Sequence, residues 1–427
     1  MRFADRPSAG ESSIDMGHGY QFIRAGALLL ACILFSASSG GPKSVPVGGH
    51  PDILVISVDT LRADRLSIHG YSRETSPRID RLMAAGAIFD QARTVEPLTA
   101  PALISMLTSL PPHRHGASRN GLRMRSGLPS LPKALAEAGY DTAAILGNWT
   151  LRDRLTDLGE HFGHYDLVLN RRRWFGLVRG EATAEDLNQR TLEYLENRGA
   201  GDEDRKPVFL WVHYVEPHAP YRLWREDADD IGLPENNLTK SDRYDSEIRF
   251  VDRQIGDLLA DLEEGRHLRN PIIVFTSDHG EHNGDQGLIY KETFLNGSVR
   301  VPLLVRTPET AKSDTAGSVS DSPAEWFDIG PTLVELAGGE MKHRQDAKSL
   351  CGTVNDPKHE HRDFAVSEYD HEAMYMDRKW KLMVNAEGQP YALFDLVDDP
   401  MEIRNLINDP SSTTTISKLH KRLGGIY

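Results

Sequence analysis

Residues 52–59 read DILVISVD, a nearly continuous aliphatic run that ends in a carboxylate. A run of this length is typical of a strand that is buried on both faces of a parallel sheet. Similar runs follow at 142–146, 207–214, 271–277 and 302–306, and stretches with helical spacing, such as 130–138 and 241–264, lie between them. The alternation predicts an α/β fold with a large, mostly parallel central sheet flanked by helices.

The pattern changes after about residue 345 to shorter alternating pieces at 364–368, 379–384 and 391–395. Alternation with period two predicts a small antiparallel C-terminal sheet. The expected organisation is a leader and linker over residues 1–45, a large α/β domain over 46–345 and a C-terminal subdomain over 346–427.

The composition is that of a globular protein, because 39% of the 427 residues are hydrophobic and 26% are charged. The formal net charge of -14 argues against nucleic acid as a partner. An anionic substrate would need a site that is locally positive against this background.

The N-terminus has the layout of a secretory signal. Arg24 precedes an apolar run over residues 25–37, and small residues follow it. The run is too short to predict a transmembrane helix. The tetrapeptide LLAC at 29–32 is typical of a lipoprotein cleavage box, which makes Cys32 a candidate membrane anchor, and ordinary cleavage near Ser38 is the alternative. Both versions predict export, to the periplasm or as an outer-surface lipoprotein.

Acidic and imidazole side chains stand where two of the predicted strands end. Asp59 closes the first run, and Asp278 and His279 follow the run at 271–277. Because parallel strands end at one edge of a sheet, these groups predict one divalent-metal site there. The imidazole favours zinc or manganese, with calcium as the alternative. The competing interpretation is that each aspartate merely caps a helix.

Three further elements carry candidate chemistry. Thr99 stands at the start of a helix-like stretch, where its hydroxyl could bind a metal and act as a nucleophile, or simply cap the helix. His213 and His218 lie in HYVEPHAPY, and could bind substrate oxygens or protonate a leaving group. For His213 a satisfied core histidine is the alternative. Lys291 is either a substrate cation or a solvated surface lysine.

Together these motifs resemble the sulfatase family of the alkaline phosphatase superfamily over most of residues 51–410. The matching segments are 58–90, the Thr99 block at 94–116, VHYVEPHAPY at 212–221, SDHGE at 277–281 with GLIYKET and VRVPLLVR after it, FDIGPTLVELAG at 327–338 and YALFDLVDDPMEIRNL at 391–406. The resemblance implies an alkaline-phosphatase-like sandwich, a smaller C-terminal sheet and one divalent metal beside the nucleophile.

The departures from the family pattern are also informative. Sulfatases that use formylglycine carry Cys or Ser, then Pro and Arg, where this chain has Thr99, Pro101 and Leu103. The family's Gly-Lys-Trp-His segment corresponds here to Gly147-Asn148-Trp149-Thr150. Threonine is not a formylglycine precursor by the usual route, so the chain is more similar to threonine-nucleophile members, which include phosphodiesterases and phosphotransferases.

The resemblance therefore predicts a metal-dependent hydrolase of sulfate esters that uses Thr99 in place of formylglycine. Its implied site has the metal ligands Asp59, Thr99, Asp278 and His279, the catalytic groups Thr99, His218 and Lys291, and the substrate-binding residues His213 and Asn148. One alternative is a phosphodiesterase or phosphotransferase acting on phosphate esters of lipid or glycan. Another is a non-catalytic member that binds an anionic glycan, which the missing cations at Leu103, Asn148 and Thr150 favour.

Overall fold

The computed structural model describes residues 50–173, 178–199, 205–341 and 346–426. The expected leader, with Cys32 and its apolar run, lies outside the described residues, and the domain boundaries remain a prediction. Among the helices that are described, none is both long and apolar enough to cross a membrane.

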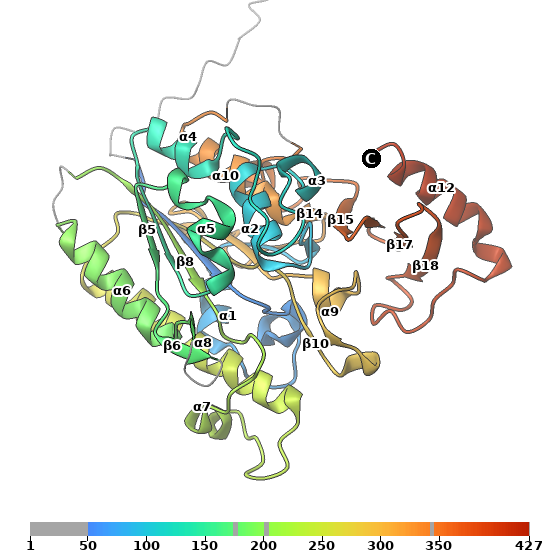
Figure 1. The fold of residues 1–427 in the computed structure, drawn as a ribbon, viewed down its shortest axis with the longest axis horizontal. Coiled ribbons are helices and arrows are strands. Elements are labelled where there is room, and N and C mark those ends of the chain that lie inside the picture. The colour runs from blue at the N-terminus through green and yellow to red at the C-terminus, as the bar shows by residue number, and fades with distance from the viewer. Residues whose placement is uncertain (1–49, 174–177, 200–204, 342–345, 427) are drawn as a thin grey trace, which may run out of the picture. The chain divides into compact units, whose positions relative to one another are not determined.

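An eight-stranded sheet forms the centre of the fold (Figure 1). Its strands follow the order β13 (Val319–Ser320), β2 (Ala87–Phe89), β12 (Leu303–Arg306), β9 (Ile272–Ser277), β1 (Ile53–Val58), β8 (Val208–Tyr214), β4 (Asp141–Leu146) and β5 (His164–Leu167). The five strands from β9 to β5 are parallel, which confirms the mostly parallel sheet.

Strand β12 departs from the expected parallel arrangement, because it is antiparallel to both β9 and β2. The connection from β9 to β12 covers residues 278–302 and contains the short strands β10 (His282–Asn283) and β11 (Ile289–Tyr290), one 3-10 turn and one four-residue helix, α9 (Asn296–Val299). It has no helix long enough to pack across the sheet, which a parallel return usually uses. The run at 302–306 is therefore a strand, as expected, but it runs in the opposite direction.

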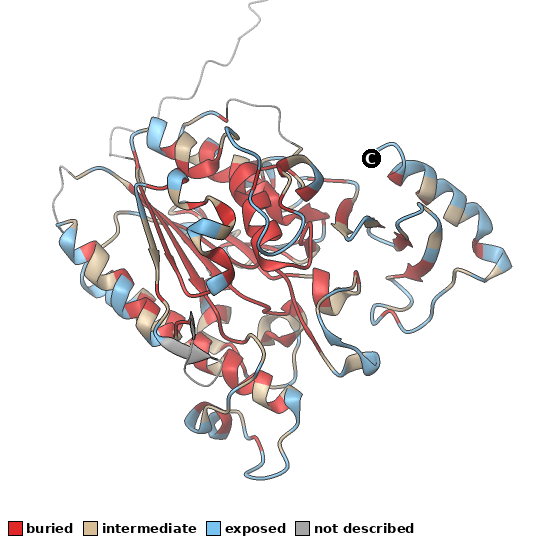
Figure 2. Ribbon diagram, viewed as in Figure 1, coloured by how far each residue is buried: buried red, intermediate tan, exposed pale blue. Residues whose placement is uncertain are grey.

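Helices cover both faces of the central sheet and make three layers. One face packs on α2 (Thr99–Thr108), α4 (Leu131–Glu137) and α10 (Ile329–Leu336). The other packs on α1 (Pro77–Met83), α6 (Ala184–Asn197) and α8 (Lys240–Glu264). Along β1, Ile53 and Val55 belong to the first core cluster and Leu54 and Ile56 to the second. Both faces are thus buried (Figure 2), which explains why β1 shows no polar alternation.

The expected C-terminal sheet is present and antiparallel, in the order β15 (Ala365–Tyr369), β16 (Glu372–Met376), β17 (Trp380–Val384) and β18 (Pro390–Asp395). Strand β16 was not among the sequence predictions. Helix α12 (Thr413–Leu423) packs on this sheet through Leu419 and Leu423. The backbone N–H of Glu368 donates to Val95 O at 2.8 Å, which joins β15 to the segment that precedes Thr99.

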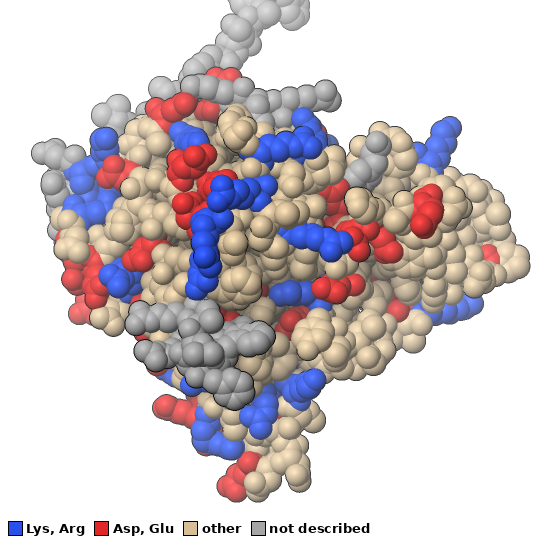
Figure 3. All heavy atoms as spheres, viewed as in Figure 1, with Lys and Arg blue, Asp and Glu red and all other residues tan. Residues whose placement is uncertain are grey.

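Charged side chains of both signs cover the surface. On the face drawn in Figure 3, Lys and Arg are interspersed with Asp and Glu.

Candidate active site

Asp59 follows β1 at the carboxyl edge of the sheet and is fully buried. Its Oδ2 accepts a hydrogen bond from Asn148 Nδ2, and its Oδ1 has no hydrogen-bond partner among the described residues. The next residue, Thr60, has a left-handed backbone with φ 59°, an unfavourable conformation for a β-branched residue. Its N–H donates to Asp278 Oδ1 at 3.1 Å, so the ends of β1 and β9 are held together. Such strain is typical of functional sites.

Asp278 and His279 follow β9 and are also fully buried. Asp278 Oδ1 accepts from two backbone N–H groups, whereas Asp278 Oδ2 has no hydrogen-bond donor and lies 3.3 Å from His279 Nε2. His279 Nδ1 bonds to the carbonyl oxygen of Gly280 at 2.9 Å, so Nδ1 carries the proton and Nε2 presents a lone pair. A side chain at Gly280 would collide with the carbonyl oxygen of Gly297, which explains the glycine there.

Thr99 is the first residue of α2 and is 1% exposed. The residue at the N-cap is Leu98, so the hydroxyl of Thr99 does not cap this helix. Its Oγ1 instead lies 3.3 Å from His279 Nε2. The helix therefore presents the hydroxyl to the same edge of the sheet as Asp59 and Asp278.

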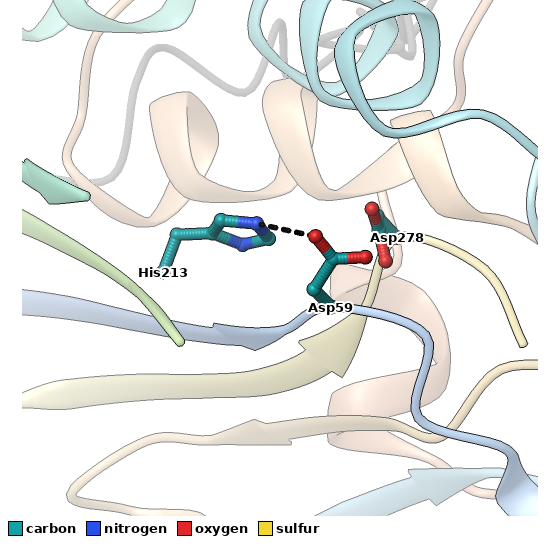
Figure 4. Close-up of side chains that lie close together, drawn as sticks. All are labelled: Asp59, His213 and Asp278. Carbon is teal, nitrogen blue, oxygen red and sulfur yellow. Dashed lines mark ion pairs between the residues drawn. The ribbon is translucent and has the colours of Figure 1, made fainter. Parts of the chain in front are cut away.

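His213 lies on β8, beside Asp59 (Figure 4). Its Nδ1 shares a hydrogen bond of 2.8 Å with Ser57 Oγ, which also accepts from Trp211 Nε1. Its Nε2 is buried without a hydrogen bond, 3.8 Å from Asp59 Oδ2. Only one ring nitrogen is therefore satisfied, which does not fit the interpretation as a core histidine.

The donor set fits a cation. Three buried atoms have no hydrogen-bond partner among the described residues, namely Asp59 Oδ1, Asp278 Oδ2 and His213 Nε2. Their side chains lie together, with Asp59 between His213 and Asp278 (Figure 4). One ligand atom from each of these residues lies within 4.8 Å of the others. Leaving such polar atoms unpaired in the interior costs several kcal/mol in all, by an estimate of about 1–3 kcal/mol each. A divalent cation would satisfy them, and His279 Nε2 and Thr99 Oγ1 lie beside the same carboxylates.

The pKa values of the Asp59 and Asp278 carboxyl groups are shifted in opposite directions. Burial and the neighbouring Asp59 raise the pKa of Asp278 well above its usual range. Burial also acts to raise the pKa of Asp59, but His218, His213 and Lys291 outweigh it and hold that pKa below its usual range. Burial, and then Lys291, lower the pKa of His279 and keep its imidazole neutral. A neutral imidazole is the form that binds a metal.

His218, in the loop after β8, and Lys291, in the segment between β9 and α9, contact each other near the site. His218 Nδ1 donates to Ala219 O at 2.7 Å, so its Nε2 can accept from Lys291 Nζ at 3.3 Å. The loop that carries His218 is held at the site because Thr60 Oγ1 donates to Pro217 O at 3.0 Å. The pair thus places an amino group and an imidazole side by side near the site.

Asn148 lies against a predicted metal ligand. Its amide donates to Asp59, and its Oδ1 accepts from both the N–H and the hydroxyl of Thr150 at 2.9 Å. Contact between Asn148 and substrate remains a prediction. Leu103, where the family has arginine, is fully buried in the core.

Sequence reasoning did not identify Asn120, whose Oδ1 accepts from the N–H of Ala100 at 2.9 Å and so lies at the start of α2. Asn120 is twenty-one residues from Thr99 in a loop without a metal or catalytic pattern. Sequence reasoning also missed the buried Glu281, which accepts a hydrogen bond from the Tyr221 hydroxyl. The quoted segments SDHGE and HYVEPHAPY contain both residues, so their proximity could have been suspected.

Comparison with known families agrees with this geometry. A model of the family described as sulfatase matches residues 51–339. A second model, of the C-terminal part of N-sulphoglucosamine sulphohydrolase, matches residues 284–426. The chain belongs to the sulfatase family, which confirms the resemblance noted from the motifs.

Individual relatives and structures are consistent with that family. Choline-sulfatase of Rhizobium meliloti is 29% identical over 434 residues, covering 85% of this chain and 83% of that protein. The multifunctional alkaline phosphatase superfamily protein PehA of Trinickia caryophylli is 26% identical, with 84% and 92% covered.

Two solved structures share the fold. BT4656, in complex with D-glucosamine-2-N,6-O-disulfate, has a TM-score of 0.76 at 20% identity and covers 88% of this chain and 97% of its own. The phosphonate monoester hydrolase of Agrobacterium radiobacter has a TM-score of 0.72 at 21% identity, with 88% and 95% covered.

Proposed function

We propose that this chain is a metal-dependent hydrolase of sulfate esters in which Thr99 is the nucleophile. The observation that supports it best is the position of Thr99 Oγ1, which lies 3.3 Å from His279 Nε2 at the edge where Asp59 and Asp278 meet. Membership of the sulfatase family and the similarity to choline-sulfatase favour a sulfate ester. The substrate class is an anionic ester, of which sulfated glycans are one kind.

Asp59, Thr99, Asp278 and His279 are the residues proposed to hold one divalent ion, zinc or manganese before calcium, and His213 is a fifth donor in reach. When bound, the ion supplies positive charge that lowers the pKa of a hydroxyl and offsets charge on the ester oxygens. Elemental analysis of Asp278→Ala against wild type tests the set. Undiminished metal in the variant would contradict it, and His213→Ala beside His279→Ala would show which imidazole binds.

The chain's own groups account for the rest of the reaction. The Thr99 hydroxyl gives up its proton to solvent, Oγ attacks sulfur, the bond from Oγ to sulfur forms, and the bond from sulfur to the alcohol oxygen breaks. Lys291 Nζ donates a proton to the departing oxygen, and His218 Nε2 lies at 3.3 Å from Lys291 to relay protons. Water then attacks sulfur, releases sulfate and restores the Thr99 hydroxyl.

Substitution of Thr99 tests the nucleophile. Thr99→Ala should lower kcat/KM by at least about 10³-fold, by analogy with other covalent catalysts that lose an essential group. Thr99→Ser should keep part of the activity because the hydroxyl remains. Thr108→Ala is a matched control, since Thr108 is buried at the far end of the same helix. Substantial turnover by Thr99→Ala would show that water is the nucleophile.

A phosphodiesterase or phosphotransferase acting on lipid or glycan is the second candidate. It is favoured by Thr99 in place of a formylglycine precursor, and by the similarity to PehA. A panel of sulfate monoesters, phosphate monoesters and phosphate diesters distinguishes the two by their kcat/KM values. Absence of turnover on every ester by metal-loaded wild type would instead favour the non-catalytic glycan-binding member.

Export is proposed from the leader alone. Fractionation of cells that express the full-length chain should place it outside the cytoplasm, and Cys32→Ser should release it from membranes if Cys32 is lipidated. Retention of an unprocessed chain in the cytoplasm would contradict both versions.

A further inference from the structure

A cavity of about 1400 Å³ lies at the amino edge of the central sheet, far from the candidate active site. Its lining comes from the residues before β1, from α1, from the C-terminal half of α8, and from the adjoining ends of β9 and β12. Arg306 at the end of β12 pairs in register with Ile273 at the start of β9. Since β1 spans six residues, the two edges are separated by roughly 20 Å. The cavity is therefore separate from the candidate active site.

The floor of the cavity is aliphatic. It is formed by leucine side chains from four segments, namely Leu54, Leu82, Leu259, Leu262 and Leu268. Leu259 and Leu268 are only partly buried, so they offer apolar surface to an occupant. A floor of this kind suits a flexible hydrocarbon chain and gives no polar group to a sugar or a nucleotide base.

The wall of the cavity is rich in arginine, although the whole chain has a net charge of -14. Arg78 pairs with Asp257 and Arg205 with Asp52, so these two are neutralised. Arg81, Arg266 and Arg306 have no ion pair with any described residue, and Glu263 is the one acid among the lining residues that the structure describes. The lining thus keeps an excess of positive charge.

Two buried nitrogen atoms at the cavity lack hydrogen-bond partners among the described residues. Arg306 Nε is buried without a hydrogen bond among the described residues, and so is one ring nitrogen of His50, Nδ1. A buried donor without an acceptor is costly, and an anion is the partner that an unpaired guanidinium binds most strongly. The missing partner is therefore negatively charged.

We propose that this cavity is a binding site for an anionic amphiphile, with one aliphatic chain on the leucine floor and an acidic head group on Arg306 and Arg81. Arg266 lies at the same lining and adds positive charge. The inference is independent of the proposed function, because no lining residue belongs to the candidate active site.

Equilibrium binding to the purified full-length chain tests the proposal. The probes are dodecanoate and dodecylphosphonate, which are not esters and cannot be cleaved, at concentrations below their micellar range. Each should bind at least tenfold more tightly than dodecyltrimethylammonium or acetate. Shortening the chain should weaken binding by about threefold to fourfold per methylene, the factor that follows from burying one CH₂ group.

Paired substitutions locate the site. Arg81→Gln with Arg306→Gln should weaken dodecanoate binding at least tenfold and leave ester turnover unchanged. Arg154→Gln is the matched control, because Arg154 is exposed and its side chain makes no ion pair with any described residue. If the double variant fails to fold, Arg81→Gln with Arg266→Gln replaces it, since both of those residues are exposed.

Four results would overturn the proposal. Equal binding of dodecyltrimethylammonium would remove the role of charge, and equal binding of acetate would remove the role of the leucine floor. Full binding by the arginine variants would place the ligand elsewhere. No binding of either probe, together with a dimer in sedimentation that the arginine variants dissociate, would identify a second copy of this chain as the occupant.

Discussion

Two aspartates flank strand β1, Asp52 before it and Asp59 after it, and both are fully buried. Asp52 accepts four hydrogen bonds, from two nitrogens of Arg205 and from the N–H groups of Val208 and Arg269, at 2.6–3.2 Å. Asp59 accepts one, from Asn148, and keeps one oxygen unpaired.

The difference shows how to separate a structural carboxylate from a functional one. Burial alone does not distinguish the two, because both cost desolvation. Asp52 recovers that cost through a guanidinium and two backbone donors within the chain. Asp59 has only the Asn148 amide as a donor and faces Asp278, so its unpaired oxygen remains available to a bound cation.

The largest effect is expected from Asp59→Asn. Turnover should fall by at least about 10⁴-fold, as for other groups on which a catalytic unit depends. In the presence of a chelator, however, the variant should unfold close to the temperature of wild type, because Asp59 accepts only one hydrogen bond within the chain, from Asn148. Steady-state kinetics and calorimetry with a chelator measure the two. A clear loss of stability without metal would mean that Asp59 is structural, like Asp52.

The reverse is expected at the other end of the strand. Asp52→Ala should lower the free energy of unfolding by about 3–5 kcal/mol, because Arg205 would be left buried without its carboxylate. Turnover per folded molecule should stay within about twofold of wild type, since Asp52 is at the opposite edge of the sheet. Urea unfolding measures the first quantity and active-site-normalised kinetics the second. A stable but inactive Asp52→Ala variant would contradict the assignment of Asp52 as a structural carboxylate.

A smaller effect is expected from Asn148→Ala, which removes the single donor to Asp59 and leaves the carboxylate in place. Metal affinity should fall by about 10-fold to 100-fold, the usual cost of losing a group that orients a metal ligand. Competition with a chromogenic chelator measures it, with Thr150→Val as the control that changes only the partner of Asn148. Unchanged affinity together with a raised KM would instead support direct contact between Asn148 and substrate.

The smallest effect is expected at His115, a buried ionisable group that is satisfied as Asp52 is. Its Nδ1 accepts from Ala117 N and its Nε2 contacts Ser105 Oγ at 2.9 Å, and burial lowers its pKa to about 3. The unfolded chain binds the proton below about pH 6.5, so this stability is complete above pH 6.5 and is lost as the pH falls toward 3.

The loss attributable to His115 should reach about 1.4 kcal/mol for each pH unit below 6.5. Urea unfolding of wild type and His115→Gln between pH 7.5 and pH 5 measures the difference, because other groups titrate in both proteins. Identical slopes in the two proteins would show that His115 titrates normally in the fold.

Much of the fold was predictable because it rests on local patterns. The aliphatic runs that form β1, β8 and β9 are continuous, and continuity records burial on both faces. The antiparallel direction of β12 was not predictable from its own residues, since direction depends on the elements in the connection that precedes it. Strand β16 was not predicted from the sequence because a tight turn at Asp370 and His371 separates it from β15 by only two residues.

The candidate site was predictable where its residues end strands or begin a helix, as Asp59, Asp278 and Thr99 do. It was not predictable where a side chain's partner comes from a distant segment. Asn148 is eighty-nine positions from Asp59, and no local pattern indicates that its amide donates there. The cavity at the amino edge was even less predictable from the sequence. Arg81, Arg266 and Arg306 are brought to one lining only by the packing of α1, the segment after α8 and β12.

The hydrogen bonds between β15 and the segment before Thr99 bear on how this chain can be cut or fused. Glu368 N–H bonds to Val95 O, and the Ser367 hydroxyl bonds to Thr94 O. Lys381 of β17 donates to Phe294 O and to Asn296 Oδ1 at 2.9 and 2.8 Å, close in the chain to Lys291. A shortened chain that ends before residue 365 would lose the backbone support of both segments, so a minimal module that retains turnover has to include the C-terminal sheet.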